Sequence, residues 1–314
     1  MAPVISLKPS RELPQELIDL IVDHLHSDRH TLITSSLIAR AWVSRTRRYL
    51  FHCIEISTRN APAVYECLDN PFCTFRSSVK AVVVKSKELG FPVTLRYWIK
   101  RLIPLLSTIR LIEKMEVVNT QDIIIWRALQ ASTTAAQITH LTFRDVQFKS
   151  FSSWKQTIQS FPSLTSIRYI TSTEPDILEW QSGDPGSTYL APGNLRHLEI
   201  VANLCCPVQQ PWSQLMWDWL LQSEIRLTRI RLDGLITISL NDVPTENLKA
   251  FAEYIRFLGP SLEALNLYFR DKHAASKLYL IFLAHECLKM IRSIYLSSLL
   301  RSDGLHVEYR TSRA

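Results

Sequence analysis

The sequence predicts an α/β protein in which a short N-terminal module of three helices precedes a solenoid of parallel strands and helices. Three observations lead to this prediction. The first fifty residues carry apolar side chains at helical spacing, a strand-like apolar triplet recurs along the rest of the chain, and helix-like segments separate the triplets. We expect a flexible N-terminus over residues 1–10, the helical module over residues 11–51 and the solenoid over residues 52–314.

The composition is that of an ordinary globular protein. Apolar residues make up 46% of the 314 residues and charged residues 21%, which is enough apolar surface for a large core. No apolar run approaches the roughly 20 residues that span a bilayer, and the first ten residues do not have the pattern of a secretory signal. We therefore expect a cytoplasmic or nuclear protein without a membrane partner.

The cysteines and the net charge carry little functional information. The six cysteines are scattered without zinc-type pairs, so we expect reduced thiols and no metal site. The net charge of +7 is spread along the chain, and the only tight basic cluster is Arg45, Arg47 and Arg48. A dispersed excess of this kind is usual for a solvated surface.

The first predicted helix covers Leu13–Leu25 and is apolar on more than one face. Pro14 suits a helix start, because proline has no N–H that would need an intrahelical partner there. Two further helical segments follow, at Thr31–Ala39 and Ala41–Phe51. A module of about forty residues has too little core to cover every apolar side of its first helix. One side is therefore expected to dock onto something else, either a partner or the downstream part of the chain.

This segment resembles the F-box. The resemblance rests on a Leu-Pro start, a Leu-Ile-x-Arg-x-Trp centre ending at Trp42, and a Tyr-Leu-Phe close at Tyr49–Phe51. It implies a three-helix module that docks onto the Skp-family adaptor of a cullin–RING ubiquitin ligase. By position, it assigns adaptor contacts to Leu13, Pro14, Leu17, Ile18, Ile21, Leu37 and Trp42, although Trp42 also suits a core position.

The remaining residues repeat the pattern apolar-x-x-apolar-x-apolar. The last two apolar positions are two residues apart, which is the period of a strand with one buried face. Successive triplets start 26 to 35 residues apart. They begin at Phe51, Val79, Ile112, Ile138, Leu164, Leu195, Leu227, Leu262 and Ile291.

Helical segments separate most of these triplets. Strands that alternate with helices at this spacing require parallel neighbours, with the helices on one side. The expected helices are Ala63–Asp69, Leu95–Ser107, Asp122–Ala131, Ser152–Phe161, Trp212–Ser223, Thr245–Leu258 and Ala275–Met290. The same alternation also suits a compact, doubly wound α/β domain.

The triplet series resembles the leucine-rich repeats of a horseshoe-shaped solenoid. The asparagine usual three positions after the triplet occurs only as Asn203, so the curvature is expected to be irregular. Residues that flank the inner apolar positions would then point onto a concave face, where a client protein would bind. The candidates are His140, Arg144, Arg168, His197, Glu199, Arg229, Arg231, Asp233, Asn266 and Tyr268.

The four arginines of this face form a basic band, which leads to two alternatives. In the first, the band recruits an acidic or phosphorylated client segment, because the planar guanidinium group matches the geometry of carboxylate and phosphate. Alternatively, the arginines pair with Glu199, Asp233 and their neighbours, and the face is merely solvated.

No catalytic motif is found in the sequence. There is no phosphate-binding glycine loop, nucleophile elbow or His/Glu metal motif, so we expect neither an enzyme nor a cofactor. The resemblance implies instead a substrate-recognition adaptor of a Skp–cullin–F-box type ligase. Two alternatives stay open. One is a helix-turn-helix nucleic-acid binder with Ala41–Phe51 as its recognition helix, and the other is a solenoid scaffold unrelated to ubiquitin transfer.

Overall fold

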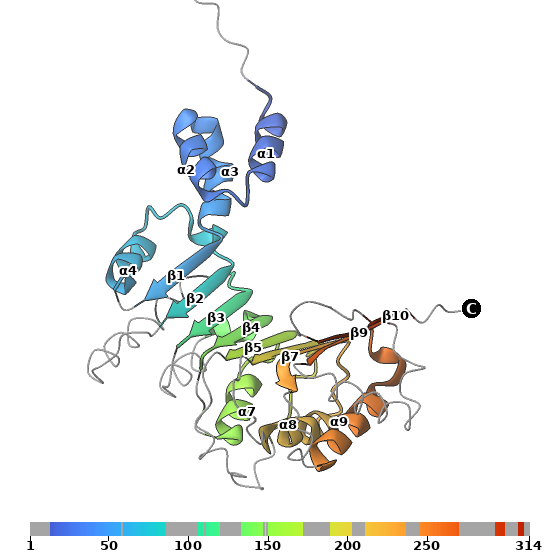
Figure 1. Cartoon of the computed structure of the whole chain (residues 1–314). Coiled ribbons are helices and arrows are strands. Elements are labelled where there is room, and N and C mark those ends of the chain that lie inside the picture. Colours follow the sequence, from blue (N-terminus) through green and yellow to red (C-terminus); the bar gives the residue numbers. More distant parts are fainter. Residues whose placement is uncertain are drawn as a thin grey trace, which may run out of the picture.

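The computed structural model shows a small helical module that leads directly into a long sheet with helices along one side (Figure 1). The structure describes residues 13–57, 59–85, 104, 106, 107, 109, 111–119, 133–146, 148, 150–171, 189–202, 211–236, 245–269, 293–298 and 307–310. The expected flexible N-terminus and the expected helices at Asp122–Ala131 and Ala275–Met290 lie outside these residues, as does most of Leu95–Ser107.

The N-terminal module consists of α1 (Gln15–His24), α2 (Arg29–Ile38) and α3 (Arg40–Leu50). Pro14 occupies the N-cap position of α1, and the Asp28 side chain accepts a hydrogen bond from the Thr31 N–H to start α2. Ala39 is extended and separates α2 from α3. The three helices enclose a small apolar core of their own.

The described residues of the remaining chain form one ten-stranded sheet whose strands follow their order in the sequence. Every neighbouring pair from β1 to β9 is parallel, and only β10 runs antiparallel. The strands are β1 (Cys53–Ser57), β2 (Ala81–Lys85), β3 (Lys114–Val118), β4 (His140–Arg144), β5 (Ser166–Thr171), β6 (His197–Ala202), β7 (Arg229–Ile236), β8 (Ala264–Phe269), β9 (Ser293–Ser298) and β10 (Val307–Arg310).

This strand order confirms the predicted α/β class with a solenoid-like parallel sheet. A doubly wound domain would reverse its strand order at a switch point, and the sequential order contains no such reversal among the described strands. The antiparallel β10 was not predicted.

The pairing register places equivalent triplet positions opposite one another along the sheet. One row runs from Ile54 through Val82 and Met115 and continues into every later strand up to β9. A second row, two residues further on, starts at Ile56 and Val84. These rows form the inner face of the sheet, and most of their described side chains are buried in one continuous core. The register therefore stacks each repeat's apolar face on those of its neighbours.

A ladder of backbone hydrogen bonds sets this register just before each strand. The carbonyl of Thr139 accepts from the N–H groups of both Thr165 and Ser166, and the Thr165 carbonyl accepts in the same way from Arg196 and His197. From β1 to β7, a carbonyl just before each strand accepts hydrogen bonds from two consecutive N–H groups at the start of the next strand. The accepting carbonyls belong to His52, Lys80, Glu113, Thr139, Thr165, Arg196 and Thr228.

The described helices cover the inner face of the sheet, and none of them lies on the other face, which we call the open face (Figure 1). The described helices are α4 (Ala61–Asp69), α7 (Phe151–Gln159), α8 (Pro211–Gln222) and α9 (Thr245–Leu258), with short 3-10 turns η1 (Arg76–Ser78), η2 (Thr133–Gln137) and η4 (Gly259–Ser261). Aromatic side chains join α7 to α8 and α8 to α9, as where Trp154 meets Trp219 edge-on at a ring-centroid distance of 5.1 Å and Trp217 stacks on Tyr254.

The helical module joins the sheet without a linker. Only Phe51 and His52 separate α3 from β1. The ring of Phe51 stacks on that of Phe75 with centroids 4.0 Å apart, and the guanidinium of Arg47 donates a 2.8 Å hydrogen bond to Thr74 Oγ1. These contacts attach the last helix of the module to the first repeat of the sheet.

Candidate interaction surfaces

Helix α1 buries one apolar side and exposes the other. Ile18 and Val22 point into the module's core, where they pack with Leu32 of α2. Ile18 is only 5% exposed, so its expected place on a docking surface is wrong. Its side chain holds the helices together, because it lies on the side of α1 that faces α2 and α3.

The other side of α1 carries large apolar side chains that no described part of the chain covers. Leu17 and Ile21 are 46% and 40% exposed, and Leu13 and Pro14 extend the same apolar surface to the start of the helix. Leu37, near the end of α2, is 81% exposed. The sequence reasoning did not name three further members, Leu20, Ile33 and Ile38. We refer to the exposed residues of α1 and α2, with Leu13 and Pro14 just before α1, as the exposed apolar set: Leu13, Pro14, Leu17, Leu20, Ile21, Ile33, Leu37 and Ile38.

Trp42 of α3 is half-buried and packs against the module's core. It therefore contributes mainly to the packing that holds α1 and α2 in place. Its partial exposure still leaves part of the indole on the surface.

An ion-paired network orients α1 on α3. Arg45 donates two hydrogen bonds to the carboxylate of Asp23, from Nε at 2.7 Å and from Nη2 at 2.6 Å. The hydroxyl of Tyr49 donates a third, at 2.8 Å, to Asp23 Oδ1. The hydrogen bonds from Arg45 and Tyr49 lower the pKa of Asp23 to about 2, since they stabilise its ionised form.

The second surface is the open face of the sheet, formed by side chains that alternate with the buried rows. On β4, for example, Leu141 and Phe143 are buried, whereas His140 is exposed and Thr142 and Arg144 are half-buried. The other candidate residues with described side chains also lie on this face: Arg168 and Arg229 are exposed, and His197, Glu199, Arg231 and Asn266 are half-buried. Asp233 and Tyr268 occupy the corresponding positions by register, but their side chains lie outside the described ones.

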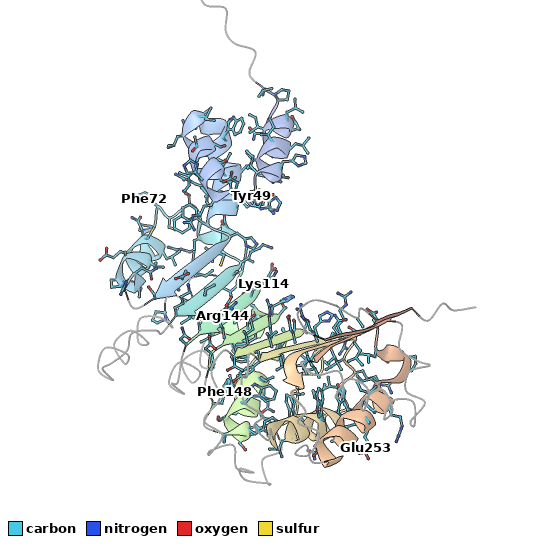
Figure 2. All side chains as sticks on the ribbon, viewed as in Figure 1. Tyr49, Phe72, Lys114, Arg144, Phe148 and Glu253 are labelled. Carbon is cyan, nitrogen blue, oxygen red and sulfur yellow. The ribbon has the colours of Figure 1, made fainter. Side chains whose placement is uncertain are left out.

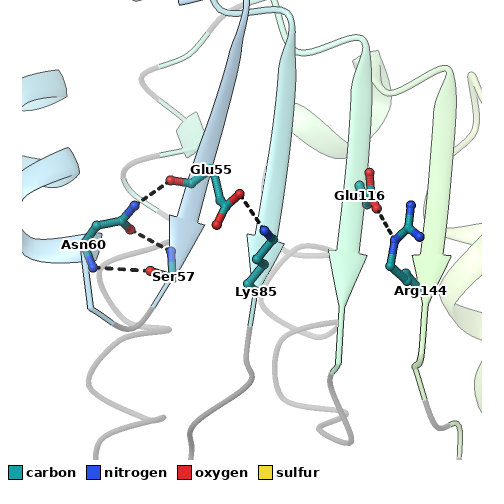
Figure 3. Close-up of polar contacts among 6 residues, drawn as sticks. All are labelled: Glu55, Ser57, Asn60, Lys85, Glu116 and Arg144. Carbon is teal, nitrogen blue, oxygen red and sulfur yellow. Dashed lines mark hydrogen bonds and ion pairs between the residues drawn. The ribbon is translucent and has the colours of Figure 1, made fainter. Parts of the chain in front are cut away.

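Side chains such as Arg144 project from the strands (Figure 2), and ion pairs connect neighbouring strands across this open face. Arg144 Nε lies 2.8 Å from Glu116 Oε1, and Lys85 Nζ lies 2.6 Å from Glu55 Oε2 (Figure 3). Glu116, Glu55 and Lys85 were not among the candidates from the sequence. Glu116 could have been named from the sequence, because aligning the triplets of β3 and β4 places it diagonally opposite Arg144 on the same face of the sheet.

Glu199 forms ion pairs with two arginines on the open face. Glu199 lies opposite Arg168 on one side and opposite Arg231 on the other. Arg168 Nε is 3.1 Å from Glu199 Oε2, and Arg231 Nη1 is 3.5 Å from Oε1. Arg229 Nε reaches Glu263 at 3.9 Å. Each arginine of the expected basic band thus lies beside a glutamate, which matches the alternative of paired arginines for these four residues.

Two histidines lie in one row of the open face, on β4 and β6. Partial burial lowers the pKa of His140 and of His197, and nearby cations, Lys114 and Arg229 respectively, lower these pKa values further. His140 Nδ1 lies 2.8 Å from Thr139 Oγ1. Both rings therefore favour the neutral form at neutral pH, when they can accept a hydrogen bond as well as donate one.

The described residues contain neither a cluster of three or more potential metal ligands nor a helix with the length and apolar character needed to cross a bilayer. In comparisons with known proteins, no protein-family model matches this chain and no curated protein matches its sequence.

Proposed function

We propose that this chain is the substrate-recognition adaptor of a Skp–cullin–F-box type ubiquitin ligase. In this proposal, residues 11–51 are an F-box whose exposed apolar set binds a Skp-family adaptor, and through it a cullin–RING ligase. The leucine-rich-repeat-like solenoid captures a client protein on its open sheet face. The chain itself performs no chemistry. It supplies proximity between the client and the transfer machinery in the cytoplasm or nucleus.

One observation carries the proposal. Seven large apolar side chains, six on α1 and α2 and Leu13 just before α1, are exposed within a module that already has a core of its own. Apolar surface of this kind is expected to be covered by a partner protein. The side chains are Leu13, Leu17, Leu20, Ile21, Ile33, Leu37 and Ile38. They occur in the segment that resembles the F-box.

The test is co-purification of the full chain with a Skp-family adaptor. The Leu17→Asp variant should lose adaptor binding, because the added carboxylate would have to be desolvated in an apolar interface. Leu111→Asp is the matched control, since Leu111 lies on the solenoid and is 48% exposed, close to the 46% of Leu17. The control should bind the adaptor normally. Equal binding by both variants would overturn the docking proposal.

The helix-turn-helix alternative receives less support from the contacts of α3. Arg45 is engaged by Asp23, and Arg47 is engaged by Thr74. Arg48 is exposed, but one side chain is a small surface for binding phosphates. The same purified protein distinguishes the alternatives. Salt-sensitive duplex binding without adaptor binding would favour the nucleic-acid reading, and absence of both would favour a scaffold unrelated to ubiquitin transfer.

The proposed client is a protein with an acidic or phosphorylated segment that binds the open face of the sheet. An acidic or phosphorylated segment would have to compete with Glu199 and Glu263 for the arginines that they contact. The face also contains buried polar atoms, His197 Nδ1 and Asn266 Oδ1, that have no hydrogen-bond partner among the described residues.

A further inference from the structure

The first strand of the sheet, β1, is an edge strand, and its outer backbone groups face away from β2. The His52 carbonyl accepts from Lys80 and Ala81 and so points towards β2. Backbone groups alternate in direction along a strand, so those of Ile54 and Ile56 also face β2. The N–H and C=O groups of Glu55 and Ser57 therefore face outward. Exposed groups of this kind are a template for pairing with a strand of another chain.

The side chain of Asn60 occupies two of these outward groups (Figure 3). Its Oδ1 accepts a 2.7 Å hydrogen bond from the N–H of Ser57, and its Nδ2 donates a 2.9 Å hydrogen bond to the carbonyl of Glu55. Both distances are those of good hydrogen bonds.

These two contacts reproduce what a neighbouring parallel strand would make. In a parallel ladder, the residue opposite Ile56 would donate its N–H to the carbonyl of Glu55 and accept from the N–H of Ser57. The carboxamide of Asn60 carries the same donor and acceptor on one rigid group. It thus stands where the peptide groups of an added strand would be.

The position of Asn60 in its own helix supports this reading. Asn60 is the N-cap residue of α4, a position where asparagine normally caps the helix through its side chain. Here the side chain makes no cap hydrogen bond and turns to β1 instead. The backbone still begins the helix, since the Asn60 carbonyl accepts from Val64 N–H at 2.9 Å. Helix α4 therefore holds the carboxamide against the strand edge.

We infer that Asn60 closes the edge of β1 and so prevents strand pairing with a second copy of this chain. The partner excluded in this way would present an edge strand, and the surface it would use is the outward row of Cys53, Glu55 and Ser57.

The experiment measures self-association of the full chain by sedimentation velocity over a range of concentrations. Asn60→Ala should self-associate at a concentration at least roughly tenfold lower than the unaltered chain, because it uncovers the pairing groups of β1. Asn70→Ala is the matched control. Asn70 ends the same helix and makes a comparable side-chain hydrogen bond, to Phe72 N–H at 2.8 Å, away from the strand edge. It should associate no more than the unaltered chain.

A second substitution separates edge pairing from misfolding. Ser57→Pro removes the outward N–H without touching the bonds to β2, a position where an edge strand tolerates proline. Added to Asn60→Ala, it should restore the original association behaviour. Should Asn60→Ala fail to fold, Asn60→Ser takes its place, because serine keeps a helix-capping residue but cannot span both backbone groups. Unchanged association of the folded variant, or association that Ser57→Pro leaves in place, would overturn the inference.

Discussion

The guanidinium of Arg45 donates two hydrogen bonds to the carboxylate of Asp23, although the two residues are 22 positions apart in the chain. This pair fixes the rotation of α1 against α3, together with the Tyr49 hydroxyl on the same carboxylate. Because Ile18 and Val22 are then turned inward, the opposite side of α1 presents Leu17 outward. The exposed apolar residues of α1 are thus positioned by a polar contact on another side of the helix.

The Asp23 network should make the module sensitive to acid. The pKa of Asp23 is lowered from 3.8 to about 2 in the folded chain, so its stabilising effect is complete above about pH 4 and is lost as the pH falls towards 2. Asp23→Asn should lower the free energy of unfolding at pH 6 and flatten its dependence on pH between 4 and 2. Urea denaturation across this pH range measures both effects.

The control for this prediction is Asp28→Asn. Asp28 also has a lowered pKa, but its causes are the hydrogen bonds that it accepts from Thr31 at the start of α2. Its replacement should weaken α2 and leave the contact between α1 and α3 in place. Only Asp23→Asn should therefore reduce binding of the Skp-family adaptor through a misplaced α1. An identical loss in both variants would contradict the positioning role.

The stacked pair Phe51 and Phe75 should couple the helical module to the sheet. Phe75→Ala removes a partly buried ring from the core and from the stack, and we expect a loss of about 1–3 kcal/mol in the free energy of unfolding. The junction around His52 should also become more sensitive to protease. Phe72→Ala is the control, since Phe72 lies on the same connection but is 87% exposed, and it should change stability by less than about 0.5 kcal/mol.

Two residues at strand ends should tolerate glycine but not a branched side chain. Asn119 and Asp145 follow β3 and β4 directly, and each has a φ of 52° in the left-handed region. Each donates its N–H at 2.8 Å to the next strand, to Arg144 and Ile170 carbonyls respectively. Asn119→Val should cost about 1–2 kcal/mol of folding free energy, whereas Asn119→Gly should be close to neutral. Thermal unfolding measures the difference, and equal effects of the two variants would contradict it.

These left-handed residues also explain part of what the sequence could not predict. An asparagine stands three positions after the last apolar residue of a triplet only at Asn203, which lies outside the described residues. The polar residue that ends β3 and β4 instead stands two positions after the last apolar residue, as Asn119 and Asp145. The strands themselves were predictable, because their two-residue period depends only on local sequence. The short β10 was not, since Val307–Arg310 contains no triplet.

The exposed apolar residues of α1 were harder to predict than the helix that carries them. Helix α1 has apolar residues on several sides, so periodicity alone gave no reason to place Ile18 inside and Leu17 outside. That choice depends on contacts with α2 and α3, which are distant in sequence. The ion pairs of the open face could not be predicted from local sequence either, because they depend on which strands become neighbours in the sheet.

The shared carboxylate of Glu199 leads to the last prediction, which concerns the charge of the client. Glu199 lies between Arg168 and Arg231, so reversing both arginines to glutamate would place three carboxylates side by side and repel an acidic segment. Client capture from cell extract should then be lost. Reversing Lys80 and Lys85, which belong to other ion pairs and are not among the client-binding candidates, makes an equal change in net charge and should leave capture largely intact. Undiminished capture by the first double variant would exclude an acidic or phosphorylated client, because such a segment could not be held beside those added negative charges.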